Sequence, residues 1–287
     1  MTVKAMKTFI LSVPPTAGNA VVPGAVAALD GSCTRFEVMA GSLSFATPLD
    51  LCALRALVDQ AARVCDTVFF DCPVTPDVHN YLARMNFYER IPANVELSRG
   101  APALRRTNRT ARLIEVCRVE SSDDVQRLEE SVWAVAQPHF GSGPMARACV
   151  SVIAAATENV LDHAKSPVGA MVAAQSYSRT GLQLAVVDLG LGIPDTLRSR
   201  AEYRSLTDIE AVRRALDDGV TSTGEAGRGA GLAEIISSAQ RTRNSTLVIQ
   251  SGRAQFTVSC SRGTARTYST RPGISTPGTW ISLVLKP

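Results

Sequence analysis

The sequence has no apolar run that reaches the roughly 18–20 residues required to cross a bilayer. Its first 15 residues contain a short apolar patch but no cleavage site of small residues, so we expect no signal peptide. No two cysteines have CxxC spacing, and the three histidines are scattered at positions 79, 139 and 163, which argues against a zinc site. The odd count of seven cysteines favours reduced, mostly buried thiols and a cytoplasmic location.

What the chain does contain is ample apolar material, since 45% of its 287 residues are hydrophobic. This composition excludes a disordered polymer. The net charge of +4 is small, and five arginines between positions 99 and 112 lie in a stretch rich in Pro, Gly, Ser and Asn. We interpret that stretch as a solvated linker at 101–110 between domains at 1–100 and 111–287, and expect neither a nucleic-acid nor a membrane partner.

Strand-like and helix-like patterns alternate within residues 1–100. Alternating or buried apolar runs predict strands at 35–40 and 66–71. Helical spacing predicts helices at 49–61 and 78–85. This order favours a small α/β domain with neighbouring parallel strands.

Residues 111–287 begin with a predicted strand at 113–119, a helix that begins at the capping residues 121–124, and a long helix at 145–163. Further helices are predicted at 207–216 and 230–239. The remaining predicted strands are 168–178, 182–188, 246–250, 254–260, 264–269 and 279–285. The pattern indicates helices covering one face of a mixed sheet.

The first motif that suggests chemistry lies on the long predicted helix. Asn159 and His163 are four residues apart and therefore project from one helix face. The amide oxygen of Asn159 is a suitable Mg²⁺ ligand. A polar patch on an exposed helix is the simpler alternative.

The second motif follows a predicted buried strand that ends at Asp188. Gly190 and Gly192 come next and allow a ligand to approach the backbone closely. A carboxylate at this point can accept a hydrogen bond from an exocyclic amine such as that of adenine. A dinucleotide fingerprint is excluded because its third glycine is replaced by Asp195, and the chain has no Walker-type GK[ST] element.

The third motif is a glycine-rich loop before a predicted helix, with glycines at every second position: Gly227, Gly229 and Gly231. Such spacing leaves backbone N–H groups to face an anion at the helix N-terminus. The segment 219–231 is also suited to close as a lid, although a flexible connection is the alternative. A fourth short segment, Gly278-Thr279-Trp280, opens the last predicted strand and means little alone.

Together and in this order, the four segments resemble the ATP-binding domain of the GHKL superfamily, which includes gyrase and histidine kinases. The resemblance implies a Bergerat-type α/β sandwich with a mixed, largely antiparallel sheet, and it implies ATP and Mg²⁺ as cofactors. It implies that Asn159 binds the metal and Asp188 recognises adenine. We also place Arg228 against the terminal phosphate. The remaining expected nucleotide-binding residues are His163, Gly190, Gly192, Gly227, Gly229, Gly231, Leu232 and Thr279.

The N-terminal half is similar to STAS-like domains. The similarity is carried by LSFATPLDLCALRAL at 43–57, VFFDCP at 68–73 and YLARMNFY at 81–88. A STAS-like and a GHKL module together resemble bacterial regulatory ATP-binding proteins related to anti-sigma-factor serine kinases.

One position departs from the GHKL pattern. Hydrolytic and serine-kinase members carry a glutamate four residues before the motif asparagine, and this chain has Ala155 there. Glu158 and Asp162 are the remaining candidates for a catalytic base, although neither matches the usual position on the helix.

These observations favour an ATP·Mg²⁺-binding regulatory protein that acts as a nucleotide-dependent switch for a protein partner. A homodimer is compatible with this interpretation. A serine/threonine protein kinase or a slow ATPase is the enzymatic alternative. A third reading is an interaction module with a vestigial ATP domain. Asp188→Ala is expected to abolish ATP binding and to leave the fold intact.

Overall fold

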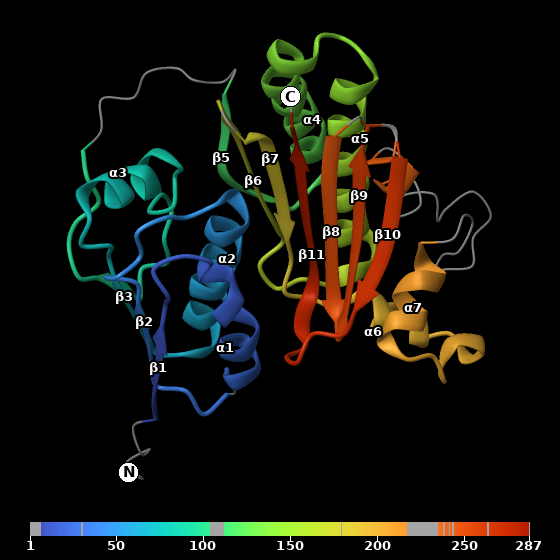
Figure 1. Cartoon of the computed structure of the whole chain (residues 1–287). Helices are drawn as coiled ribbons and strands as arrows, with labels where there is room; N and C mark the ends of the chain where they lie inside the picture. Colours follow the sequence, from blue (N-terminus) through green and yellow to red (C-terminus); the bar gives the residue numbers. More distant parts are fainter. Residues whose placement is uncertain are drawn as a thin grey trace. The chain divides into compact units, whose positions relative to one another are not determined.

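A computed structural model describes residues 7–29, 31–103, 112–178, 180–216, 235–237, 239–240, 242, 244–262 and 264–286. The chain divides into two compact units, Met1–Thr107 and Asn108–Pro287. The fold is mixed α/β, with a four-stranded parallel sheet in the first unit and a seven-stranded antiparallel sheet in the second (Figure 1). Within the described part of the chain, no helix combines the length and apolar character required to cross a membrane.

The first unit has a sheet in the order β1-β2-β3-β4, in which every neighbouring pair is parallel. Its strands are β1 (Thr8–Ser12), β2 (Arg35–Met39), β3 (Thr67–Asp71) and β4 (Val95–Leu97). Its helices are η1 (Gly18–Val21), α1 (Val22–Ala28), α2 (Pro48–Val64) and α3 (Pro76–Arg84). The predicted alternation of strands and helices and the parallel pairing are confirmed.

Helix α2 begins at a capping box. The Asp50 backbone N–H donates to Thr47 Oγ1 at 3.2 Å, and the Thr47 N–H donates to Asp50 Oδ2 at 2.8 Å. The other carboxylate oxygen of Asp50 accepts the N–H of Asn19 at 2.8 Å. Pro48 occupies the first helical position, where its missing N–H costs nothing. Local sequence therefore fixes where this helix begins.

A buried ion pair holds α2 against the turn that follows α3. Arg55 Nε lies 2.9 Å from Asp59 Oδ1, and both side chains are almost fully buried. The same guanidinium donates to the backbone carbonyls of Phe87, Glu89 and Arg90. These bonds satisfy a charge that would otherwise be costly to bury.

The expectation of reduced thiols is wrong for one pair, because Cys33 and Cys65 form a disulfide. Cys33 precedes β2 and Cys65 precedes β3, and these strands pair in parallel with Arg35 opposite Thr67. The pairing brings the two cysteines together across 32 residues of sequence, which no spacing rule reveals. The remaining five cysteines are thiols, four of them buried, as expected for small hydrophobic side chains.

The second unit has strand order β10-β9-β8-β11-β7-β6-β5. Its strands are β5 (Leu113–Val119), β6 (Ala170–Tyr177), β7 (Gly181–Val187), β8 (Asn244–Gly252), β9 (Ala254–Ser261), β10 (Thr264–Thr270) and β11 (Thr276–Leu285). Its helices are α4 (Ser122–Phe140), α5 (Pro144–Asn159), η2 (Val160–Ala164), α6 (Ile193–Arg198), η3 (Ala201–Tyr203) and α7 (Asp208–Ala215). Helices α4 and α5 pack against each other and lie along one face of the sheet, where their apolar residues join a single core (Figure 1).

Two expectations for this unit need correction. All neighbouring pairs among its described strands are antiparallel, so this sheet is not mixed. The long helix expected to 163 ends its α-helical part at Asn159 and continues as a π-helical turn, η2. The helix expected at 230–239 lies largely outside the described residues, although 235–237 are helical.

Candidate functional site

Asp188 lies directly after β7 and is fully buried. Its Oδ1 accepts the backbone N–H of Gly190 at 2.7 Å, and its Oδ2 accepts the backbone N–H of Thr279 at 2.8 Å. Trp280 Nε1 donates to the Asp188 carbonyl at 3.2 Å. One aspartate thus joins the loop after β7 to the bulged start of β11.

The electrostatic environment of Asp188 disfavours its charge. Burial raises the pKa of Asp188 to about 7, and the N–H groups of Gly190 and Thr279 oppose that rise. The carboxyl group therefore exchanges its proton near neutral pH. Titration in this range at a buried site is a feature of functional carboxylates.

The loop after Asp188 contacts the end of the long helix. Leu191 N–H donates to the carbonyl of Ala164 at 2.5 Å. A Cβ on Gly190 would collide with the same carbonyl, so only glycine fits there. We expected this glycine to let a ligand approach, whereas in the structure the close neighbour is the protein's own backbone. The π-helical turn ends at Ala164, whose carbonyl is thus satisfied by the loop.

The same kind of close approach occurs at Gly278, which precedes Thr279. Its φ is +64°, and a Cβ there would collide with the carbonyl and carboxylate of Asp188. A Cβ on Gly192 would lie 2.9 Å from the Gly278 carbonyl oxygen and 2.6 Å from Ser251 Oγ, and both distances are too short for a side chain. These glycines thus allow three segments to lie close together, namely the loop after β7, the end of β8 and the start of β11.

Among the residues expected at a catalytic or metal site, burial differs sharply. Asn159 and His163 are half-buried at the end of the helix. Glu158 and Asp162 are exposed. Ala155 is buried in the apolar core, with 6% of its surface exposed. The expected phosphate-loop and lid residues lie outside the described part of the chain: Gly227, Arg228, Gly229, Gly231 and Leu232.

One residue at this site was not singled out from the sequence. Ser251 is fully buried; its Oγ accepts the N–H of Ile193 at 2.8 Å and lies 2.7 Å from the Gly278 carbonyl, to which it donates. Trp280, the last residue of the fourth motif, is also buried beside Asp188. A usable signal existed for Ser251, because alternation along β8 puts it on the buried face with Leu247 and Ile249.

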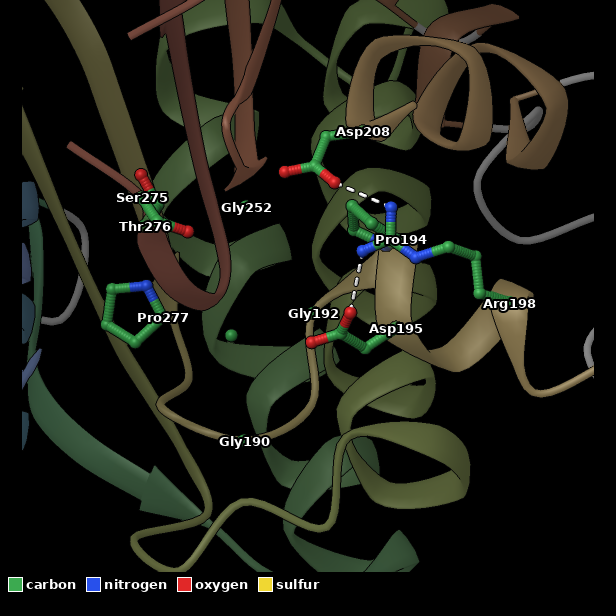
Figure 2. A pocket seen from close by; sticks show the side chains of 11 residues that line it. Gly190, Gly192, Pro194, Asp195, Arg198, Asp208, Gly252, Ser275, Thr276 and Pro277 are labelled. Carbon is green, nitrogen blue, oxygen red and sulfur yellow. Dashed lines mark hydrogen bonds and ion pairs between the residues drawn. The ribbon is translucent and has the colours of Figure 1, made fainter. Parts of the chain in front are cut away.

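A cavity of about 190 Å³ lies beside the loop after β7 (Figure 2). Its lining includes Gly190, Gly192 and Gly278 but not Asn159 or Asp188. Its volume is below the roughly 300–1,000 Å³ of typical small-molecule pockets. This cavity therefore lies next to the Asp188 site and is not itself large enough for a nucleotide.

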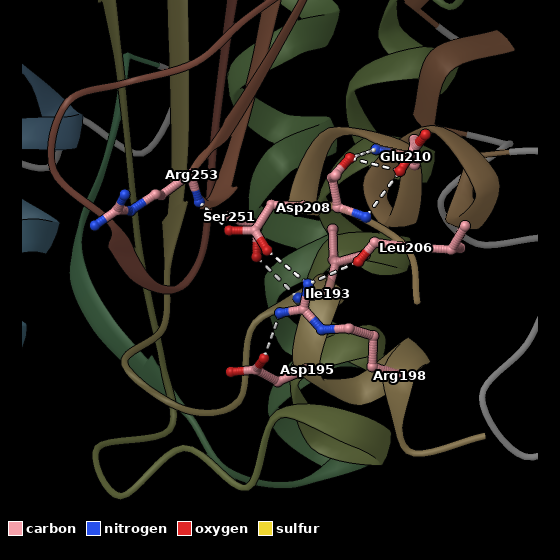
Figure 3. A network of polar contacts seen from close by, with 9 residues as sticks. Ile193, Asp195, Arg198, Leu206, Asp208, Glu210, Ser251 and Arg253 are labelled. Atoms are coloured by element: carbon pink, nitrogen blue, oxygen red, sulfur yellow. Dashed lines mark hydrogen bonds and ion pairs between the residues drawn. The ribbon is translucent and has the colours of Figure 1, made fainter. Parts of the chain in front are cut away.

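Three of the residues that line the cavity, Asp195, Arg198 and Asp208, form an ion-pair network (Figure 3). Arg198 donates to Asp195 Oδ1 and to Asp208 Oδ1, each at 2.7 Å. Asp208 Oδ2 also accepts the backbone N–H of Arg253 at 2.6 Å. The network connects α6 to the start of α7 and to the turn between β8 and β9.

In the described part of the chain, no three histidine, cysteine, aspartate or glutamate side chains lie close enough to hold a metal ion. The chain matches no model of a known protein family. It also matches no curated protein.

Proposed function

We propose that the second unit is a GHKL-type ATP·Mg²⁺-binding domain and that the chain is a regulatory switch whose nucleotide state controls a protein partner. The first unit would be a STAS-like domain that takes part in this regulation. The observation that carries the proposal is the convergence of three motifs that are far apart in the sequence. The end of the Asn159 helix contacts Gly190, and Asp188 contacts Gly278 and Thr279.

The chemistry of Asp188 fits an adenine amine. A carboxylate has two lone pairs on each oxygen, and each oxygen of Asp188 accepts one backbone N–H. One acceptor position therefore remains on each oxygen. A buried carboxylate that is hydrogen-bonded by the protein is also held in a fixed orientation, which favours recognition of one donor group.

The complete burial of Asp188 supports a switch. A ligand amine reaches this carboxylate only if a neighbouring group moves. Binding of the base would then be coupled to a rearrangement of the loop at 189–192, which contacts the helix end at Ala164 and the start of β11. A ligand that binds one arrangement better than the other shifts the population between them.

Mg²⁺ prefers oxygen ligands and binds with few protein groups plus phosphate and water. Asn159 offers a neutral amide oxygen on a half-buried helix end. When bound there, the ion would neutralise phosphate charge. The phosphates themselves would be held by the backbone of the glycine-rich loop at 227–231, together with Arg228.

The position of Ala155 supports a binding role over catalysis. This residue packs in the apolar core, so the helix face at that position offers no carboxylate to a water or hydroxyl group. Glu158 and Asp162 remain the candidates for a base in the alternative function, a serine/threonine kinase or slow ATPase. Both are exposed to solvent, and neither occupies the usual position of the base on the helix.

The first experiment is calorimetric titration of the whole chain with ATP and Mg²⁺. Asp188→Asn should weaken ATP binding about tenfold or more, because a charged acceptor is lost. Asp195→Asn is the matched control, since Asp195 is an exposed acid seven residues away. No ATP binding by the wild type, or equal affinity in both variants, contradicts the proposal.

A phosphate-release assay on the same sample separates the two functions. The switch predicts binding without release. Release that falls in Glu158→Gln or Asp162→Asn would instead identify a catalytic base and favour the enzyme.

A further inference from the structure

Strand β10 is the last strand at one end of the seven-stranded sheet, and no described strand pairs with its outer side (Figure 1). It pairs with β9 along its whole length, from Thr264–Ser261 to Thr270–Gln255. Six of its seven residues are exposed and Ser269 is half-buried. A regular strand with an open edge is a template for pairing with another chain.

The hairpin geometry decides which backbone groups are available on this edge. Only two residues separate Ser261 from Thr264, and the closing pair of such a hairpin exchanges both of its backbone hydrogen bonds. Because this pattern alternates along antiparallel strands, every second residue from Thr264 onward directs its N–H and C=O groups toward β9. The residues that direct theirs outward are Ala265, Thr267 and Ser269.

The edge carries few of the features that block such pairing. Natural edge strands are protected by proline, lysine, bulges or inward-pointing charges. Strand β10 reads TARTYST, with Arg266 as its one charged residue, and its register with β9 has no bulge. Threonine and tyrosine also favour extended backbone.

We propose that β10 pairs antiparallel with β10 of a second copy of this chain, about a two-fold axis at Thr267. In this register Thr267 faces the partner's Thr267, and Ala265 faces the partner's Ser269. All three outward-pointing residues of each strand then meet outward-pointing residues of the other. The pairing forms six backbone hydrogen bonds and joins two seven-stranded sheets into one.

The side chains favour this register and a second copy as the occupant. Arg266 lies opposite the partner's Tyr268, and Tyr268 opposite the partner's Arg266. These are the non-hydrogen-bonded pairs, in which side chains approach most closely and a guanidinium can lie over a ring. An axis at Arg266 would instead place two like charges directly opposite each other in a non-hydrogen-bonded pair, which is destabilising.

Sedimentation of the full chain at about 100 µM tests the dimer. The wild type should sediment as a dimer and Thr267→Pro as a monomer, because proline removes one outward N–H but no bond to β9. Thr267→Ala keeps that N–H and should remain dimeric. A monomeric wild type, or a dimer unchanged by Thr267→Pro, overturns the proposal.

Cysteine cross-linking tests the register. In hydrogen-bonded antiparallel pairs the Cα atoms are about 5.5 Å apart, within the range that a disulfide bridges. Thr267→Cys should therefore cross-link on oxidation. Ser269→Cys should not, since its symmetry mate is four residues away, or about 13 Å. A mixture of the Ala265→Cys and Ser269→Cys chains should cross-link, because these two positions face each other across the axis. If Ser269→Cys by itself cross-links as much as Thr267→Cys, the register is wrong. The wild type is the control for cross-linking through the native thiols.

Discussion

Asp188 Oδ2 accepts the backbone N–H of Thr279 at 2.8 Å, although the two residues are 91 positions apart in the sequence. The bond connects the end of β7 with the start of β11, which are neighbouring antiparallel strands. Asp188 is thus both a candidate ligand-binding group and a structural link between two strands. Substitutions at this position will change binding and stability together.

Asp188→Ala should destabilise the second unit, contrary to the expectation from sequence that the fold would be unaffected. Alanine leaves the buried N–H groups of Gly190 and Thr279 without an acceptor, and each loss costs about 1–3 kcal/mol. Asp188→Asn retains one acceptor and should lose about half as much. Urea denaturation of both variants measures the difference, and wild-type stability in Asp188→Ala would contradict this role.

The stability of the second unit should depend on pH through Asp188. Burial raises its pKa to about 7 from the ordinary 3.8, so the folded state holds a proton that the unfolded state releases. The stabilisation from this proton is complete below pH 3.8 and is lost as the pH rises through about 7. The total stabilisation that can be lost in this way is at most about 4 kcal/mol.

This pH dependence is measured as the difference between wild type and Asp188→Asn in the free energy of unfolding, at about pH 5 and about pH 8. The difference between the two chains removes the contributions of other groups. Wild type should lose stability relative to the variant at the higher pH. A difference that is the same at both values would mean that Asp188 is ionised throughout.

Gly190→Ala should destabilise the chain by about 1–3 kcal/mol, because the new Cβ collides with the Ala164 carbonyl. Gly273→Ala is the matched control in the same unit, since a Cβ there has no atom within 4 Å. Chemical denaturation of the two variants provides the comparison. If both behave alike, the contact between the loop and the helix end is not tight.

Asp195 and Asp208 both pair with Arg198, and they should contribute unequally to the free energy of unfolding. Asp208 is 20% exposed and also accepts the Arg253 N–H, so Asp208→Ala should cost about 1–3 kcal/mol. Asp195 is 67% exposed, and Asp195→Ala should cost less than about 1 kcal/mol. Thermal unfolding of both variants tests this order, and a larger effect at Asp195 would reverse it.

Much of the secondary structure could be predicted because its causes are local. Ser121 and Asp124 form the capping box that begins α4, and both are readable from the sequence. The alternating pattern of β8 likewise appears directly in the order of its residues. In each case the residues that determine the element are neighbours in the chain.

The candidate site was predicted only in part, because the residues that form it are far apart in the sequence. The sequence indicated Asp188 and Gly190, but not that Ala164 is the neighbour that requires a glycine. The Ser251 bridge to Ile193 and Gly278 was missed because its partners lie 58 and 27 positions away. The Cys33–Cys65 disulfide was missed for the same reason.

The sequence by itself determined most of the longer elements of this protein, their approximate bounds and the residues whose chemistry suggests nucleotide binding, but not β1, α1, β4 or α6. Short-range capping, periodicity and glycine spacing are sufficient for that, because they act within a few residues. Only the tertiary structure decided that Asp188 is fully buried with a pKa near 7, and that β10 is the last of the described strands at one end of its sheet. Burial and strand order depend on which distant segments pack together, and the local pattern of residues does not specify that packing.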